Sequence, residues 1–209
     1  FAIVTTILIN VFAFAIAYML VKKFRGRNVF RSVFFMPNLI GGIVLGYIWL
    51  LLLNGILGFW ARSITYDATY GFWGMVILMC WQQIGYMMVI YIAGLQSIPA
   101  ELIEAAEMDG ASRARSLRSV IIPLVMPSIT VCTFLTITNG FKMFDQNLAL
   151  TNGAPSRLSE LLALNIFNTF YGRPGFEGVG QAKAVVFLLI VAVIALVQNR
   201  YARSKEAIA

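Results

Sequence analysis

Few side chains in this 209-residue chain are of types that carry out covalent chemistry. It contains no histidine, and its two cysteines, Cys80 and Cys132, lie in long apolar stretches with no charged neighbour. We therefore expect both cysteines to pack in the interior, and we find no nucleophile, acid–base pair or metal site. The chain also lacks a GxxxxGK[ST] loop for nucleotide phosphates. We predict no catalytic residue and no cofactor in it; if ATP drives its action, a partner subunit binds the ATP and Mg²⁺.

One polar segment, residues 99–122, interrupts the apolar sequence and contains EAAEMDGAS at residues 104–112. Its first residue is a proline, which suits the first turn of a helix, and we expect that helix to cover residues 100–108. Gly110 then provides a left-handed stop, and a second short helix can follow. The segment would lie along the membrane surface, where Glu104 offers a carboxylate to an arginine of a partner. A solvated connector is the alternative.

The elements that position these residues are apolar helices. Hydrophobic residues make up 60% of the chain and charged residues only 12%, which is typical of an integral membrane protein. A bilayer core about 30 Å thick needs about 20 helical residues to cross it. We therefore predict an all-α integral membrane fold with a five-span core. The expected spans are residues 1–21, 33–53, 72–95, 123–144 and 182–199.

Lysine and arginine placement predicts the orientation of these spans, because positive charges stay with cytoplasmic loops. Five of the sixteen lie in residues 22–32, three in residues 113–118 and three after residue 199. These segments are expected on the cytoplasmic side. The net charge of +7 follows from this topology and requires no nucleic-acid partner. Residue 1 would then lie outside, and we expect the natural chain to extend further by a preceding span.

None of the nine acidic residues lies deep in a predicted span. A carrier that uses a proton or sodium gradient usually places an ionisable side chain within the membrane, so this distribution argues against gradient coupling. Backbone carbonyls of broken helices can also hold sodium, and a secondary carrier or facilitator therefore stays open as the alternative.

Two predicted spans carry uncharged polar residues. The third contains Gln82, Gln83 and Tyr86, and the fourth contains a run of threonines followed by Asn139 and Gly140. Amides, hydroxyls and aromatic faces suit a solute that is uncharged and rich in hydroxyls. Such side chains also serve as hydrogen bonds between helices, at about 0.6 kcal/mol each. From the residues alone, helix packing is the more common role.

The segment EAAEMDGASRARSLRSVIIPLVMP resembles the EAA loop of ABC-importer permease subunits. The residues that carry this match are Glu104, Ala105, Ala106, Gly110 and Pro123. MPNLIGGIVLGYIWLLLLNG, GLQSIPAELIEAAEMDGAS and FKMFDQNLALTNGAP are similar to the carbohydrate-uptake branch, in particular to the larger maltose-type permease and the first permease of glycerol-phosphate and raffinose-type systems. The turn TNGAP departs from the TxGGP of that branch at Ala154.

This resemblance implies a single type I ABC-importer transmembrane domain over residues 1–209, in a bacterial or archaeal cytoplasmic membrane. The implied partners are a second homologous permease, two cytoplasmic ATPase subunits and an extracytoplasmic solute-binding protein, for which residues 146–180 are the natural docking surface. The EAA loop would be the coupling helix that fits into a cleft of the ATPase. The implied coupling residues are Glu104, Ala105, Ala106, Asp109, Gly110 and Ala111.

The resemblance also implies a substrate pathway in the spans on either side of the EAA loop. The implied pathway residues are Gln82, Gln83, Tyr86, Thr136, Asn139, Gly140 and Met143. The expected function is one half of a translocation pathway for a sugar or oligosaccharide. Permeases for other solutes, such as glycerol phosphate, use the same loop, although the spans lack the arginine cluster that a phosphate favours.

Overall fold

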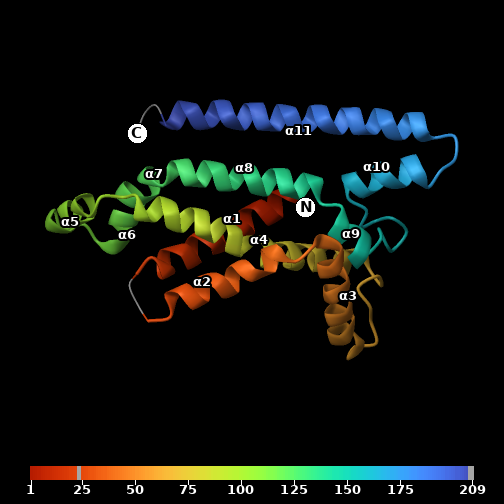
Figure 1. Ribbon diagram of the computed structural model, residues 1–209, viewed down its shortest axis with the longest axis horizontal. Coiled ribbons are helices and arrows are strands. Elements are labelled where there is room, and N and C mark those ends of the chain that lie inside the picture. The colour runs from red at the N-terminus through yellow and green to blue at the C-terminus, as the bar shows by residue number, and fades with distance from the viewer. Residues whose placement is uncertain (23–24, 207–209) are drawn as a thin grey trace.

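The computed structural model describes residues 1–22 and 25–206, with only the backbone of Asn199 and residues 201–206, so Lys23 and the side chains of Arg203 and Lys205 lie outside it. Within this part of the chain every regular element is a helix, as predicted (Figure 1). The elements are α1 (Ala2–Leu20), α2 (Arg27–Phe35), the 3-10 helix η1 (Met36–Leu39), α3 (Gly42–Gly58), α4 (Ala68–Gln96), α5 (Ala100–Met108), α6 (Arg113–Ser116), the π-helix η2 (Leu117–Ile121), α7 (Ile122–Leu124), α8 (Met126–Lys142), α9 (Asp145–Leu150), α10 (Leu162–Tyr171) and α11 (Glu177–Glu206).

Helix α4 is the central helix of the bundle and packs against α1, α2 and α8. Its side chains Met87, Met88 and Tyr91 are almost fully buried. Small residues recur on the facing side of α1, where Ala13 and Ala17 are completely buried, and they let the two helices approach closely. The core therefore lies where α1, α4 and α8 meet.

The N-terminus of α4 is capped by Asp67, whose carboxylate accepts a hydrogen bond from the Thr69 backbone N–H at 2.7 Å. Hydrogen bonds from the Thr69 side chain and backbone hold the pKa of Asp67 below its usual 3.8. An acidic N-cap satisfies an otherwise unpaired donor of the first turn and favours the positive end of the helix dipole.

Three continuous helices, α1, α4 and α11, are long and apolar enough to cross a membrane. They confirm the predicted spans at residues 1–21, 72–95 and 182–199 as helices. Helix α11 lies on the outside of the bundle, against α10 and α8. Its apolar side chains are largely exposed, as expected for a helix that borders lipid.

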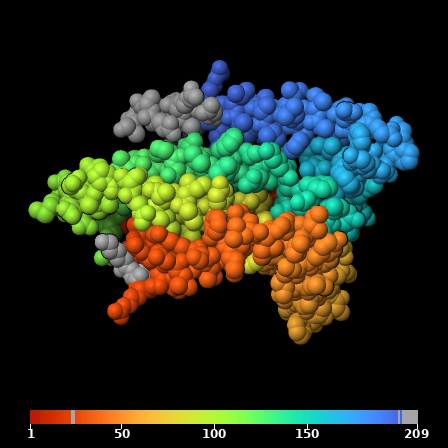
Figure 2. Space-filling view, viewed as in Figure 1, coloured from red at the N-terminus to blue at the C-terminus, as the bar shows by residue number. Residues whose placement is uncertain are grey.

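The predicted span at residues 33–53 is not one continuous helix. The chain forms two helices, α2 with η1 and then α3, which are bent by 102°. Pro37 lies in the 3-10 turn, and Ile40 then adopts an extended conformation with ψ 129°, so the α-helical hydrogen bonding stops here. Figure 2 shows the consequence: α3 projects away from the body of the molecule.

The predicted span at residues 123–144 is also bent. Residues 113–124 and helix α8 form an angle of 70°, with the break at Val125. Prolines 123 and 127 flank this break, and each removes a backbone donor and crowds the preceding turn. The described residues thus contain three continuous spans, or up to five if each bent pair crosses as one span.

Three basic segments predicted to be cytoplasmic lie at the same end of the molecule in Figure 1: the turn after α1, the region of α5 and α6, and the end of α11. A single cytoplasmic side requires this arrangement.

Glycine at position 85 is essential where α2 crosses α4. A Cβ atom built there would overlap the Phe34 carbonyl group, which is backbone and cannot move without displacing α2. We expect Gly85→Ala to lower the free energy of unfolding by about 1–3 kcal/mol. In contrast Gly55→Ala, where a Cβ meets nothing within 4 Å, should be neutral or slightly stabilising. Thermal unfolding of the purified chain in detergent would measure both, and equal midpoints for the two variants would contradict the α2–α4 contact.

Candidate functional site

The polar segment between α4 and α8 folds as predicted. Helix α5 covers Ala100–Met108, follows Pro99, and is stopped by Gly110, which has a φ of +75°. Ser112 then caps α6, with its Oγ accepting a hydrogen bond from the Arg115 backbone N–H at 3.3 Å. The predicted helix, glycine hinge and helix are confirmed. They could be predicted because proline, glycine and serine each act on adjacent residues.

Helix α5 protrudes at one end of the molecule, where it packs against α6 and η2 (Figures 1 and 2). Glu104 and Ala105 are exposed, together with Asp109 and Gly110, while Ala106 and Ala111 are half-buried. The apolar side chain of Met108 is 88% exposed. A small surface helix that combines an exposed carboxylate with exposed apolar atoms has the composition of an interface.

The predicted pathway amides take part in two pairs of hydrogen bonds, one between α4 and α8 and one between α4 and α9. The Gln83 Oε1 on α4 accepts a hydrogen bond from the Asn139 Nδ2 on α8 at 3.1 Å. The neighbouring Gln82 accepts at its Oε1 a hydrogen bond from the Gln146 Nε2 on α9, at 2.8 Å. Gln82 in turn donates to the Ile40 carbonyl at 3.3 Å, at the bend between η1 and α3. We call Gln82, Gln83, Asn139 and Gln146 the amide row.

The other predicted pathway residues lie around this row in different environments. Tyr86 is half-buried, with its ring 6.4 Å from the ring of Phe35. Thr136 is fully buried, and its hydroxyl donates to the Cys132 and Thr133 carbonyls. Gly140 and Met143 are buried as well.

Sequence analysis missed a second polar cluster, in the core. The Asn10 Nδ2 on α1 donates to the Thr136 Oγ1 at 2.9 Å, and its Oδ1 accepts from the Tyr91 hydroxyl at 2.6 Å. This cluster joins α1, α4 and α8, and both ends of the Asn10 amide have a partner in it. A lone asparagine in an apolar span was the available signal, but its partners are 81 and 126 residues away.

On the opposite end of the molecule from α5, Asn147 holds the loop after α9. It is fully buried, donates to the Thr151 hydroxyl and the Ser159 carbonyl, and accepts from the Leu161 N–H, each at 2.9 Å. Lys183 of α11 donates to Asn165 and Thr169 of α10 at 2.8 Å. These bonds attach the outer loop to α9, and α11 to α10.

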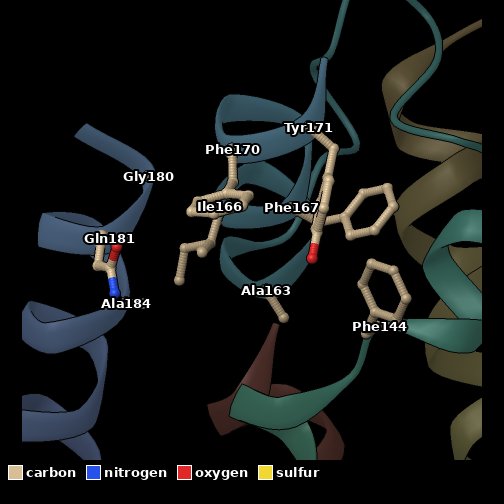
Figure 3. A pocket seen from close by; sticks show the side chains of 9 residues that line it. All are labelled: Phe144, Ala163, Ile166, Phe167, Phe170, Tyr171, Gly180, Gln181 and Ala184. Carbon is tan, nitrogen blue, oxygen red and sulfur yellow. The ribbon is translucent and has the colours of Figure 1, made fainter. Parts of the chain in front are cut away.

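An open pocket of about 390 Å³ lies between α10, α11 and the residue before α9. Figure 3 shows the rings of Phe144 and Phe167 close together, with Tyr171 beside them and Gln181 on the facing helix. The ring centroid of Phe167 lies 5.0 Å from that of Phe144 and 4.9 Å from that of Tyr171. The pocket has aromatic faces but few polar groups, so it suits an apolar occupant rather than a sugar.

The two cysteines pack as predicted. Cys132 is buried, Cys80 is half-buried, and both are free thiols. Among the described residues, no group of three or more His, Cys, Asp or Glu side chains is placed to hold a metal ion.

The family model for the binding-protein-dependent transport system inner membrane component matches residues 9–206. The chain belongs to this family. The expected resemblance is thereby confirmed, and with it the placement in a membrane. The family is a membrane component of transport systems.

Two curated relatives of the chain are permease proteins. It is 42% identical over 218 residues to the probable starch degradation products transport system permease protein AmyD of Thermoanaerobacterium thermosulfurigenes, covering 99% of this chain and 73% of that protein. It is 28% identical over 200 residues to the multiple sugar-binding transport system permease protein MsmF of Streptococcus mutans, covering 91% of this chain and 69% of that protein.

The fold also matches a solved structure. A bacterial ABC transporter involved in the import of the acidic polysaccharide alginate has a chain that superposes with a TM-score of 0.74, at 18% identity, covering 97% of this chain and 78% of that one. This match confirms the predicted type I ABC-importer transmembrane fold, whereas the count of five spans stays a prediction.

In the core cluster of the permease, Asn10→Leu removes the partner of the Tyr91 hydroxyl, and Tyr91→Phe removes a partner of the Asn10 amide. We expect each substitution to lower the free energy of unfolding by about 1 kcal/mol, and the double variant to lower it by less than the two effects together. Unfolding in mixed micelles measures this cycle, with Tyr171→Phe, an exposed tyrosine with no hydrogen bond, as the control. Strict additivity would show that the contact contributes nothing.

Proposed function

We propose that the chain forms half of the translocation pathway for a sugar or oligosaccharide in a binding-protein-dependent ABC importer. The observation that carries the proposal is the amide row. Gln82 and Gln83 lie near the middle of α4, a helix long and apolar enough to cross a membrane, and they pair with amides of α9 and α8. Polar groups at that depth are stable only where they face protein or a water-filled pathway.

The chemistry of the amide row favours an uncharged solute. Gln83 and Asn139 offer hydrogen bonds, and the half-buried ring of Tyr86 offers an aromatic face. None of the predicted pathway residues is charged, which argues against glycerol phosphate. The printed names of AmyD and MsmF refer to starch degradation products and multiple sugars, and support an oligosaccharide as the solute of this chain.

We further propose that this permease pairs with a second homologous permease, two cytoplasmic ATPase subunits and an extracytoplasmic solute-binding protein. ATP and Mg²⁺ would bind to the ATPase subunits. Helix α5 suits the contact with an ATPase, because it protrudes, exposes Glu104, and is joined to α8 through the turn at residues 109–112 and a helical segment that is bent at Val125. Residues 104–106 and 109–111 would make this contact. The absence of any acidic residue in the amide row argues against the gradient-driven carrier.

The test is ATP-dependent uptake of a labelled maltooligosaccharide by the permease reconstituted with its partner permease, ATPase and binding protein. We expect uptake by the wild-type assembly and a loss of about tenfold or more in Glu104→Lys, because reversing the charge at a paired interface position repels the partner. The ATPase should no longer copurify with this variant.

The matched control is Glu177→Lys, the same change at an exposed position near the other end of the molecule. Because Glu177 lies in the expected docking surface of the binding protein, this control applies to copurification of the ATPase, which should stay intact. Normal uptake in Glu104→Lys would contradict the assignment of α5, and uptake that needs no ATP would favour a secondary carrier.

A further inference from the structure

Gln82 and Gln146 differ in how much of each amide remains free. Gln82 is 6% exposed and uses both ends of its amide, accepting from Gln146 and donating to the Ile40 carbonyl. Each end of its amide therefore already has a partner in this arrangement. Although the amide of Gln82 lies in the predicted pathway, it is committed to the contact between α4, α9 and the bend before α3.

Gln146 uses only one end of its amide. Its Nε2 donates to Gln82, whereas its Oε1 has no partner in the described part of the chain and is not a buried atom. The same holds for the Gln83 Nε2 and the Asn139 Oδ1, since these two side chains bond to each other through their opposite ends. Three amides on three helices therefore each keep one accessible group.

Packing places the Gln146 side chain in a fixed position. Helix α3 meets α9 through two glycines: a Cβ at Gly42 would lie 2.8 Å from the Asp145 Cβ and 3.1 Å from the Gln146 Cδ, and a Cβ at Gly46 would lie 2.6 Å from the Ala149 Cβ. There is no room beside Gln146 for larger residues on α3. A side chain held by close packing on one face and by Gln82 at its nitrogen is preorganised to present its oxygen.

We propose that Gln146 is a substrate-contacting residue of the translocation pathway and that Gln82 is the positioning residue that orients it. The free Gln146 Oε1 would accept a hydrogen bond from a hydroxyl group of the sugar, and Gln83 and Asn139 would offer a further donor and acceptor. This proposal rests on the proposed function. The alternative is a purely structural role, in which Gln146 only supplies a hydrogen bond between α9 and α4.

The near-isosteric variants Gln146→Met and Gln82→Met separate these two roles, because both remove the hydrogen bond between the residues. Only Gln146→Met also removes the free oxygen, and only Gln82→Met also leaves the Ile40 carbonyl without its partner. We expect Gln146→Met to raise the KM for maltotriose by about three- to tenfold, the loss of one hydrogen bond. We expect Gln82→Met to lower the unfolding midpoint more and to raise KM less.

The measurement is maltotriose uptake by the complete assembly in proteoliposomes, alongside thermal unfolding of each variant. Gln181→Met, an exposed glutamine on α11 that makes no hydrogen bond, is the control and should change neither quantity. Should Gln146→Met fail to assemble, Gln146→Asn replaces it, since its shorter side chain keeps the amide but withdraws the oxygen, and the same rise in KM is expected.

Two outcomes overturn the inference. Wild-type uptake with an unchanged KM in the Gln146 variant, or equal effects of the Gln82 and Gln146 variants on both quantities, would show that Gln146 is only an interhelical contact and would leave the proposed function intact. If the wild-type assembly transports none of a panel of maltooligosaccharides, the proposed function fails, and this inference fails with it.

Discussion

The need to pair every polar group within an apolar bundle governs this structure. Asn10, Tyr91 and Thr136 satisfy one another inside the core, so that cluster is closed and holds α1, α4 and α8 together. The amide row is different, because Gln83, Asn139 and Gln146 each use only one end of the amide. A polar group without a partner is costly in lipid, and such groups therefore belong where water or solute reaches them. We propose that this contrast separates the scaffold from the pathway.

Close helix contacts place the amide row. Gly85 lets α2 lie directly on α4, which brings the bend after η1 to Gln82, and Gly42 lets α3 meet α9 beside Gln146. The same bent segments connect the row to the rest of the molecule: α8 carries Asn139, and the residues before its bend lead to α5. In an ABC permease this continuity offers a mechanical link between the surface helix and the pathway.

Local signals made the surface helix and three spans predictable. Pro99, Gly110 and Ser112 each act on their immediate neighbours, and long apolar runs define α1, α4 and α11 without reference to the rest of the chain. The bend near Pro37 was not predicted, because the apolar run around it is long enough for a span, and the bent conformation depends on a contact with Gly85. Gln146 was missed for a similar reason, since its partner is 64 residues away. The family resemblance implied a set of pathway residues, which stays a prediction, but not which of their polar atoms are free.

The most direct test of this account is the accessibility of single cysteines to a membrane-impermeant thiol reagent in the assembled transporter, with Cys80 and Cys132 replaced by alanine. Cysteine at position 83 or 139 should react, and loading with sugar should slow the reaction. Cysteine at position 136, whose native side chain is fully buried, should stay unreactive. Reaction at position 136 with none at 83 and 139 would contradict the assignment of the amide row to the pathway.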